Sequence, residues 1–377
     1  LVFERDGRTW VVFGSYDHNI YFLDFHTGEH ILPPFPTGDL VKGTQTVDPD
    51  GFPLLYAGSR DDHLRVIALD RPEAEELWSL HAHDVSPTMW NTDWDGAALV
   101  IDDYMYAGGE NSQFHIVRLN RSYDDEGLVQ VDPELVFNAP DWDEQLLEDL
   151  SASTAESPTN VSIENSVAFH DGMVYFANSG GLVQGWDVSG LDDGVEPTRE
   201  FRFWTGDDTD ATITVDDEGM LYVAVEYKRS LPRADELGQV LKLDPTQPDD
   251  PLVWSFHDPA TDVPRGFWAT PALHDDIVIV ASNAGVGYAL DRGTGEQRWE
   301  VNLGHQTWAS PVVVDDVWVQ ASCNEAVTGY DVADTSTAPP ELWSVTLGGC
   351  IEATPAVWDG QIFVGTRAGR FYALGDD

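Results

Sequence analysis

The chain has 377 residues, of which 42% are hydrophobic and 11% aromatic, so it can bury a large core. It carries 67 acidic residues against 19 basic residues, a formal net charge of −48. This charge excludes nucleic acid and anionic lipid surfaces as partners, because the cationic contacts that supply such affinity are missing. No apolar run approaches about 18 residues, so no transmembrane segment is predicted.

A strand-rich unit recurs along the chain. Each unit has a small-residue strand such as 56–59 or 280–283, a polar turn, an alternating strand such as 287–290, and an outer strand. The centres of the units lie between 40 residues (291 to 331) and 67 residues (120 to 187) apart. In chain order they are Asp24, Asp70, Asn120, Asp187, Asp244, Asp291, Asp331 and Gly375. Repeats of this length with about four strands each predict an all-β, eight-bladed β-propeller with four-stranded antiparallel blades.

A motif of small residue, aspartate, Thr-Gly and tryptophan marks the end of each unit and is complete at 289–299. The outer strands end at Trp78, Trp204, Trp254, Trp299 and Trp343. We expect each indole to lie on the turn of the next blade, where glycine leaves room for it. This pattern resembles the tryptophan-docking motif of the PQQ-type, quinoprotein-like propellers, which include the outer-membrane-assembly-type propellers. The resemblance covers essentially the whole chain.

We expect residues 1–377 to form a single propeller domain with an insertion at about 121–160. The middle of that insertion, 141–150, is acidic and predicts one or two helical turns. The insertion lies in a linker, so it could cover the ligand face or bind a partner. The chain starts at Leu1 without a methionine, which indicates a processed or trimmed chain.

The two cysteines, Cys323 and Cys350, are predicted to form a disulfide. Cys323 lies in the turn after the small-residue strand of the seventh unit, and Cys350 lies in the linker to the eighth. In four-stranded blades these turns and linkers emerge on the same face. A disulfide across this 28-residue segment would stabilise the fold by on the order of 3 kcal/mol and implies an oxidising compartment.

The same face, made by the linkers between blades and the turns between second and third strands, is the predicted ligand face. Its candidate residues are Lys42, Gln45, Trp90, Trp268, Trp308 and Glu352. Trp268 and Trp308 each stand three residues before a repeat proline, and Glu352 takes that place in the eighth unit. Two indoles and a carboxylate could stack on a flat or sugar-like ligand. The alternative is that the tryptophans only fill the centre of the fold.

Asn91, Asp93 and Asp95 have the alternating oxygen spacing of a calcium loop and precede Gly96, so calcium is a possible ligand there. The alternative is a simple turn. The 11 histidines show no zinc spacing, and His81 and His83 are expected to be solvated on an exposed linker.

No catalytic residue can be placed by motif. Quinoprotein dehydrogenases of the resembling family carry an adjacent Cys-Cys pair and longer inserts, which this chain lacks, so PQQ is not expected and no cofactor is predicted. We therefore interpret the chain as a non-catalytic, secreted, periplasmic or cell-surface module of bacterial or archaeal origin. It would bind a protein partner or a small ligand on the linker face. The alternative is a PQQ- or sugar-binding quinoprotein-like oxidoreductase.

Overall fold

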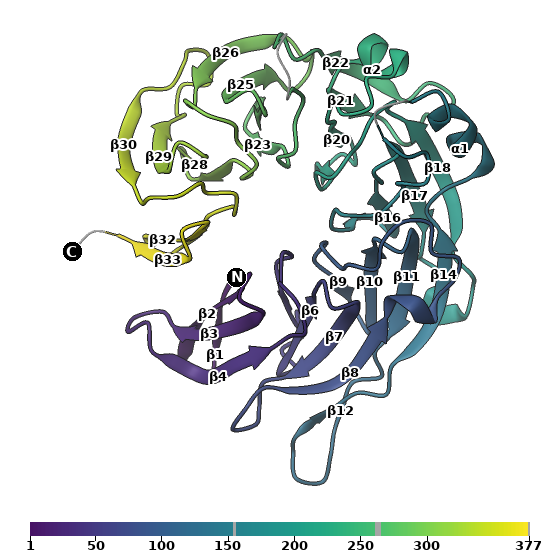
Figure 1. The fold of residues 1–377 in the computed structure, drawn as a ribbon, viewed down its shortest axis with the longest axis vertical. Helices are drawn as coiled ribbons and strands as arrows, with labels where there is room; N and C mark the ends of the chain where they lie inside the picture. The colour runs from purple at the N-terminus through teal and green to yellow at the C-terminus, as the bar shows by residue number, and fades with distance from the viewer. Residues whose placement is uncertain (154–155, 261–264, 376–377) are drawn as a thin grey trace. The chain divides into compact units, whose positions relative to one another are not determined.

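The computed structural model describes residues 1–153, 156–260 and 265–375. Their strands form seven four-stranded antiparallel sheets, one three-stranded sheet and one two-stranded ribbon (Figure 1). Within each blade the strands pair in sequence order, apart from the ribbon inserted in the third blade. The predicted all-β fold with eight blades is confirmed: the chain is an eight-bladed β-propeller.

Two compact units divide the chain. The first comprises 1–151, 157–180 and 186–199, and holds blades 1 to 3. Its blades consist of β1 (Val2–Arg5), β2 (Arg8–Gly14), β3 (Asn19–Asp24) and β4 (His30–Pro36); β5 (Thr46–Val47), β6 (Leu54–Gly58), β7 (His63–Ala68) and β8 (Glu75–His81); β9 (Leu99–Ile101), β10 (Tyr104–Gly109), β11 (Gln113–Arg118) and β14 (Glu134–Pro140). The fourth blade comprises β15 (Ala168–His170), β16 (Met173–Phe176), β17 (Leu182–Asp187) and β18 (Thr198–Trp204), whose residues are divided between the two units.

The second unit comprises 152–156, 181–185 and 200–377, and holds blades 5 to 8. These are β19 (Thr214–Val215), β20 (Leu221–Ala224), β21 (Val240–Leu243) and β22 (Leu252–Phe256); β23 (Ala272–His274), β24 (Ile277–Ala281), β25 (Val286–Asp291) and β26 (Gln297–Asn302); β27 (Val312–Val314), β28 (Val317–Ala321), β29 (Ala326–Asp331) and β30 (Glu341–Thr346); β31 (Ala356–Trp358), β32 (Gln361–Thr366) and β33 (Arg370–Leu374).

The second and third strands of each blade carry the core. All residues of β6 and β24 are buried, because these strands read as short runs of aliphatic, aromatic and small residues that are covered on both faces. A β-bulge recurs where the third strand pairs with the outer strand, for example between Val66 and Ile67 and between Ala289 and Leu290. Because the faces of the blades pack on one another, the hydrophobic clusters combine residues of neighbouring blades within a unit.

The turn of the sixth blade accommodates the tryptophan of the fifth. Trp254 is 7% exposed and donates its indole N–H to the carbonyl of Arg292 at 3.1 Å. Gly295 has a φ of +74°, and a Cβ there would lie 2.7 Å from the Trp254 ring. Asp291 accepts hydrogen bonds from the backbone N–H groups of Gly293 and Thr294, which holds this turn. The aspartate, glycine and tryptophan of the repeat thus together form one contact between neighbouring blades.

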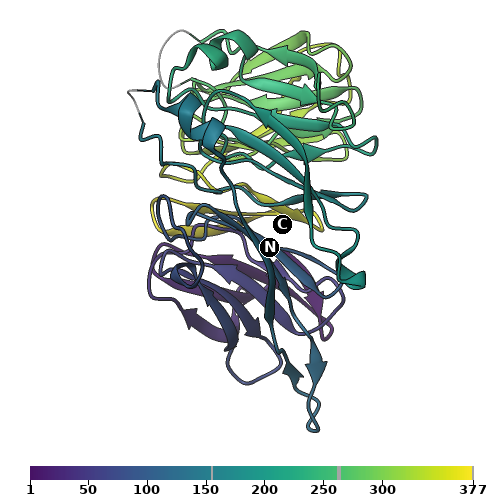
Figure 2. The ribbon, with the colours of Figure 1, turned by 90° about the vertical axis from the view of Figure 1, so that its right-hand side faces the viewer.

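The region 121–160 contains several elements. β14 is the outer strand of the third blade, and β12 (Ser122–Tyr123) and β13 (Val129–Gln130) form a ribbon that projects from its unit (Figure 2). Helix α1 (Glu144–Leu150) follows and is capped by the Asp143 side chain. The remaining helices are α2 (Pro232–Leu237) and the 3-10 turns η1 (Ala82–Asp84) and η2 (Leu191–Asp193). Among the described residues, none of the helices has the length and apolar character needed to span a bilayer.

Candidate ligand site on the linker face

The same backbone hydrogen bond recurs in successive blades and fixes two positions. A residue one to three positions after the second strand donates its N–H to a linker carbonyl, as in Glu110 to Asp93 at 3.0 Å and Asn283 to Gly266 at 2.9 Å. We call this residue the turn position; it is held by Arg60, Glu110, Ser179, Glu226, Asn283, Cys323 and Arg367. Two residues after the accepting carbonyl, and four before the inner strand, lies the linker position; it is held by Lys42, Asp95, Glu164, Asp210, Trp268, Trp308 and Glu352.

In the first unit these positions carry a compact set of charges. The Lys42 ammonium lies 2.5 Å from Asp95 Oδ2, and the Arg60 Nε lies 2.8 Å from Asp93 Oδ2. Glu110 is 3% exposed, and burial, reinforced by the charges of Glu164 and Asp95, raises its pKa to about 9. Glu110 is therefore neutral at pH 7. Lys42 and Arg60 balance the charges of Asp95 and Asp93.

The predicted calcium residues only partly converge. Oxygens of Asp93, Asp95 and Glu110 lie within 4.8 Å of one another, but Lys42 and Arg60 already neutralise the two aspartates. Asn91 instead turns its amide nitrogen toward Glu110 Oε2, at 2.9 Å. The side chains as they stand are a set of ion pairs.

The other two predicted residues of this unit are Gln45 and Trp90. Gln45 is 2% exposed and donates to the carbonyl of Gly43 at 2.8 Å. Trp90 is 45% exposed. Gln45 thus supports the linker from inside, and Trp90 offers its indole to solution.

In the second unit the predicted pair of tryptophans is in contact. The rings of Trp268 and Trp308 have centroids 4.7 Å apart with an interplanar angle of 30°. The Lys228 ammonium lies 5.0 Å from the Trp268 ring centroid, within range of a cation–π interaction. Both indoles are partly exposed. The pair therefore offers an aromatic surface beside a cation.

Three carboxylates surround Lys228. Its Nζ lies 2.9 Å from Glu226, 3.1 Å from Asp208 and 3.7 Å from Asp210. Burial, with a further contribution from Asp208, raises the pKa of Glu226 to about 8. Burial lowers the pKa of Lys228, but the three carboxylates outweigh it and leave that pKa raised. At pH 7 the cluster thus holds a charged lysine and a neutral Glu226.

A buried aspartate positions this lysine. Asp207 is fully buried and accepts hydrogen bonds from the backbone N–H groups of Lys228, Arg229 and Ser230 at 2.9–3.1 Å. The loop after β20 is therefore held at three consecutive amides, which directs the Lys228 side chain back over the linker.

Several buried polar atoms of this cluster have no hydrogen-bond partner among the described residues. They are both amide atoms of Asn283, the indole N–H of Trp308 and Asp208 Oδ1. Asn283 is 2% exposed and Glu226 is fully buried. Buried polar groups are almost always paired, and leaving one unpaired costs about 1–3 kcal/mol. Four such atoms occur on the linkers and turns of the second unit.

Backbone contacts bring Asn283 and Glu226 together. Gly266 has a φ of +85°, forms a β-bridge with Glu226, and accepts the N–H of Asn283. A Cβ on Gly266 would lie 2.8 Å from the backbone of Glu226, so only glycine allows this approach. Trp268 follows two residues later. These backbone contacts and the indole pair define the region that we call the linker site of the second unit.

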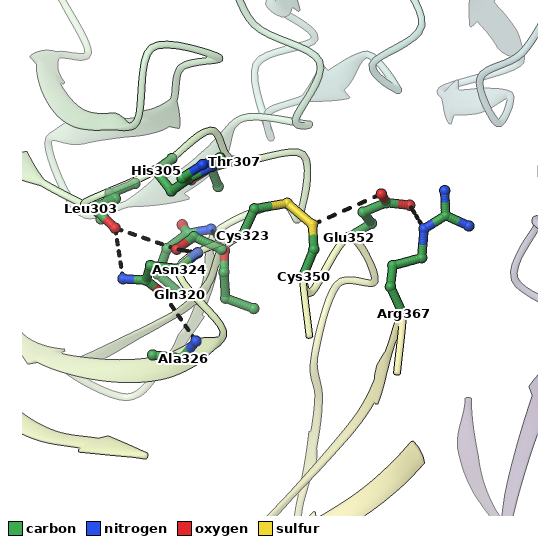
Figure 3. The surroundings of a disulfide bond; sticks show 12 residues. Leu303, His305, Thr307, Gln320, Cys323, Asn324, Ala326, Cys350, Glu352 and Arg367 are labelled. Atoms are coloured by element: carbon green, nitrogen blue, oxygen red, sulfur yellow. Dashed lines mark hydrogen bonds and ion pairs between the residues drawn. A yellow bond between two sulfur atoms is a disulfide. The ribbon is translucent and has the colours of Figure 1, made fainter. Parts of the chain in front are cut away.

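The disulfide borders the next two blades. Cys323 at the turn position of blade 7 is bonded to Cys350 in the linker before β31, as predicted (Figure 3). Glu352 lies near the sulfur, with its Oε1 3.9 Å from Cys350 Sγ, and its Oε2 accepts from Arg367 Nε at 2.9 Å. The predicted ligand-face residue Glu352 is therefore an ion-pair partner of Arg367.

Sequence reasoning missed the roles of Glu226 and Lys228. The pair belongs to a loop that departs from the repeat. Aligning the ends of the small-residue strands would have placed Glu226 beside Glu110 and Asn283, since all three occupy the turn position.

Comparisons with known proteins agree with the fold. A family model described as outer membrane protein assembly factor BamB matches residues 237–338. A stretch of 141 residues, 33% of this chain, is 27% identical to a quinohemoprotein alcohol dehydrogenase of Comamonas testosteroni; the match spans 19% of that protein. BamB from Moraxella catarrhalis superposes with a TM-score of 0.68 at 14% identity, over 100% of this chain and 96% of that chain. The computationally designed Ika8 protein gives a TM-score of 0.66 at 13% identity, over 99% and 94% of the two chains.

The sheets and the repeat thus define an eight-bladed β-propeller. The family model matches residues 237–338 of this propeller, and the likeness to BamB at 14% identity shows the same fold.

Proposed function

We propose that the chain is a non-catalytic, extracytoplasmic propeller that binds a ligand or partner group at the linker site of the second unit. The observation that carries the proposal is the set of unpaired buried polar atoms around Asn283 and Trp308, next to the stacked indoles. A ligand with hydroxyl groups and a flat or sugar-like ring would pair those atoms and cover the indoles.

The charges of the site support binding over catalysis. Lys228 remains protonated among its three carboxylates, so its amine has no lone pair for use as a nucleophile or base. Asp208 in turn is paired with that ammonium. Lys228 and the carboxylates orient one another, so Asn283 and Trp308 are the residues that would bind the ligand.

The disulfide supports the location. Structural disulfides persist in oxidising compartments, so Cys323–Cys350 favours a periplasmic, secreted or cell-surface protein. The likeness to an assembly factor of the outer membrane is consistent with a protein partner whose side chains would enter the linker site.

The proposal is tested by titrating the protein with a panel of mono- and oligosaccharides and short peptides, following tryptophan fluorescence and ligand-observed NMR. Binding by the wild type should be lost in Trp308→Ala and weakened at least about tenfold in Asn283→Ala, since each removes a pairing group. Trp358→Ala, at a tryptophan 40% exposed and in another blade, is the matched control. Binding that is equal in all four proteins would refute the site.

The second candidate function is a quinoprotein-like oxidoreductase. It is favoured by the stacked Trp268 and Trp308 and by the stretch similar to a quinohemoprotein alcohol dehydrogenase. Asp208, Asp210 and Glu226 offer oxygens within 4.8 Å of one another, but Lys228 lies among them, so these side chains do not fit a calcium ion as they stand. Reconstitution with PQQ and calcium decides the matter: quinone absorbance retained after gel filtration favours this candidate, and a colourless protein favours the binding module.

A further inference from the structure

A two-stranded ribbon projects from the first unit (Figure 2). It consists of β12, β13 and the turn between them, residues 122–130, and its two strands pair only with each other. A two-stranded hairpin on its own is at best marginally stable in water. The order of the ribbon must therefore come from contacts with the blades beside it.

Arg121, directly before β12, fixes the first strand of the ribbon. Its side chain is 5% exposed, and its guanidinium lies 2.7 Å from Asp48 Oδ2, 2.9 Å from Asp50 Oδ2 and 3.1 Å from Asp103 Oδ1. The same guanidinium lies 4.9 Å from the centroid of the Phe52 ring. A planar guanidinium held by three carboxylates and an aromatic ring is fixed in orientation, so Arg121 sets the direction in which the ribbon leaves the blade.

Val129 fixes the second strand of the ribbon. Its side chain is fully buried in a hydrophobic cluster of the first unit. Its backbone N–H donates to Asp70 Oδ2 at 2.7 Å, and its carbonyl accepts from the Arg71 guanidinium at 2.9 Å. Asp70 and Arg71 lie between β7 and β8, so the ribbon is attached to the second blade as well as to the third, in which it is inserted.

One carboxylate holds the turn of the ribbon. Asp124 Oδ1 accepts the backbone N–H groups of Glu126 and Leu128, each at 2.9 Å, and Asp124 Oδ2 accepts the amide of Gln130 at 3.2 Å. Both strands and the turn are therefore held in place before any partner binds. A surface that is already ordered loses little conformational entropy on binding, which favours affinity.

Tyr123 is the exposed aromatic residue of the ribbon. Its ring stacks on that of Phe52, with centroids 5.4 Å apart and an interplanar angle of 16°. Tyr123 nevertheless remains 52% exposed, more than any other aromatic side chain among the described residues. Tyrosine is one of the residue types that most often dominate the energy of a protein interface. The ribbon thus presents an oriented interface residue to solution.

The charge of the ribbon decides which kind of partner fits it. Its acidic residues are Asp124, Asp125 and Glu126, all of them exposed, and residues 122–130 contain no basic residue. Arg121 adds no free positive charge, because its guanidinium is paired with carboxylates. Such a surface attracts a basic partner and repels an acidic one. A second copy of this chain, with a net charge of −48, is therefore disfavoured.

We propose that the ribbon binds a basic segment of a partner protein. Tyr123 packs against the aliphatic stems and cationic groups of the partner's lysine and arginine side chains, and Asp125 and Glu126 pair with their charges. Asp124 stays in the turn and supports it. The ribbon belongs to the first unit, so its binding can be tested separately from the linker site of the second unit.

The test begins with a phage-display selection of short random peptides on the immobilised whole chain. The enriched peptides are synthesised with a fluorescent label, and their affinity is measured by anisotropy. They should carry a net positive charge, and their affinity should fall at least about tenfold in Tyr123→Ala. Tyr16→Ala is the matched control, because Tyr16 is 44% exposed and lies in the same unit; its affinity should equal that of the wild type.

A pair of charge reversals tests the acidic tip of the ribbon. Asp125→Lys/Glu126→Lys changes exposed turn residues and should weaken binding at least about tenfold. Asp249→Lys/Asp250→Lys makes the same change of charge at exposed positions of the second unit. It should weaken binding by less than about threefold, because salt screens distant charges. Equal loss in the two double variants would assign the binding to the acidic surface as a whole and overturn the proposal.

The selection itself can also overturn the proposal. No enriched peptide, enriched peptides without basic residues, or equal affinity of the wild type and Tyr123→Ala would each do so. Sedimentation of the wild type should show a monomer, and a dimer that Tyr123→Ala lacks would make a second copy the occupant instead. Circular dichroism checks folding. If Tyr123→Ala does not fold, Asp125→Lys/Glu126→Lys decides, and unchanged affinity there overturns the proposal.

Discussion

Replacing Glu226 by glutamine should change how stability depends on pH. Burial first, and then the charge of Asp208, raises the pKa of Glu226 to about 8, against an ordinary value of 4.5. The folded chain therefore holds a proton that the unfolded chain has released, over the range between these two values. The stability linked to that proton is fully present below pH 4.5 and is lost as the pH rises through about 8. The loss amounts to about 1.4 kcal/mol per pH unit.

The magnitude follows from the width of that range. Between pH 5 and pH 7.5 the wild type should lose about 3 kcal/mol of unfolding free energy through Glu226 alone. The amide of Glu226→Gln keeps the size of the side chain and does not titrate. Lys228 retains Asp208 as a charged partner in the variant, at 3.1 Å. The difference in stability between variant and wild type should therefore move in favour of the variant by about 3 kcal/mol over this range.

The assay is urea unfolding followed by tryptophan fluorescence at half-unit steps from pH 5 to pH 7.5. Glu73→Gln is the matched control, because Glu73 is exposed and the same atoms are exchanged. The control curve should run parallel to that of the wild type. A Glu226→Gln curve that is also parallel to the wild type would refute the claim that Glu226 is protonated in the folded protein.

Three further changes test the structure. Trp254→Ala should cost about 3–5 kcal/mol in urea unfolding, because it removes a buried indole and its hydrogen bond, and a cost below about 1 kcal/mol would contradict the docked geometry. Cys323→Ser/Cys350→Ser should lower the unfolding free energy by about 3–4 kcal/mol for a sequence separation of 27, and a mass spectrum showing two free thiols in protein isolated from an oxidising compartment would contradict the pairing. Lys228→Met should lower the unfolding free energy by about 3–5 kcal/mol at pH 8, because the buried carboxylates lose their cation. This loss should be smaller when Glu226→Gln is also present; an equal loss with and without Glu226→Gln would show that Lys228 and Glu226 do not interact.

The blades could be predicted from the repeat because every unit packs against the next blade in the same way. Trp254, Asp291 and Gly295 are readable in sequence, since the indole needs a glycine turn and the turn needs an aspartate to hold its amides. The stacking of Trp268 on Trp308 has the same origin: both occupy the linker position of adjacent blades. Regular features of the fold therefore appear as regular features of the sequence.

The cluster around Lys228 could not be predicted in this way. Lys228 reaches its carboxylates only because Asp207, 21 residues earlier, captures three consecutive amides of its loop. Such a contact is not part of the repeated motif. The acidic composition also hides it, since pairs such as Asp208 and Asp210 are common in a chain with 67 acidic residues.

The contact between His63 and His81 could not be predicted from the sequence because it depends on the register of a hairpin. His63 and His81 are cross-strand neighbours only because the β7–β8 pairing shifts by one residue between Val66 and Ile67. Without that bulge the side chains would point to opposite faces of the blade. The expectation that His81 and His83 are merely solvated therefore omitted the ring of His63, which lies 4.7 Å from that of His81.

A crystal structure at a resolution that shows ordered water tests the linker site most directly. We predict a polar molecule within hydrogen-bonding distance of the Asn283 amide and of the Trp308 indole N–H, and its replacement by a saccharide or peptide that is soaked into the crystal. A side chain of the protein itself paired with both groups, leaving no room beside the indoles, would contradict it.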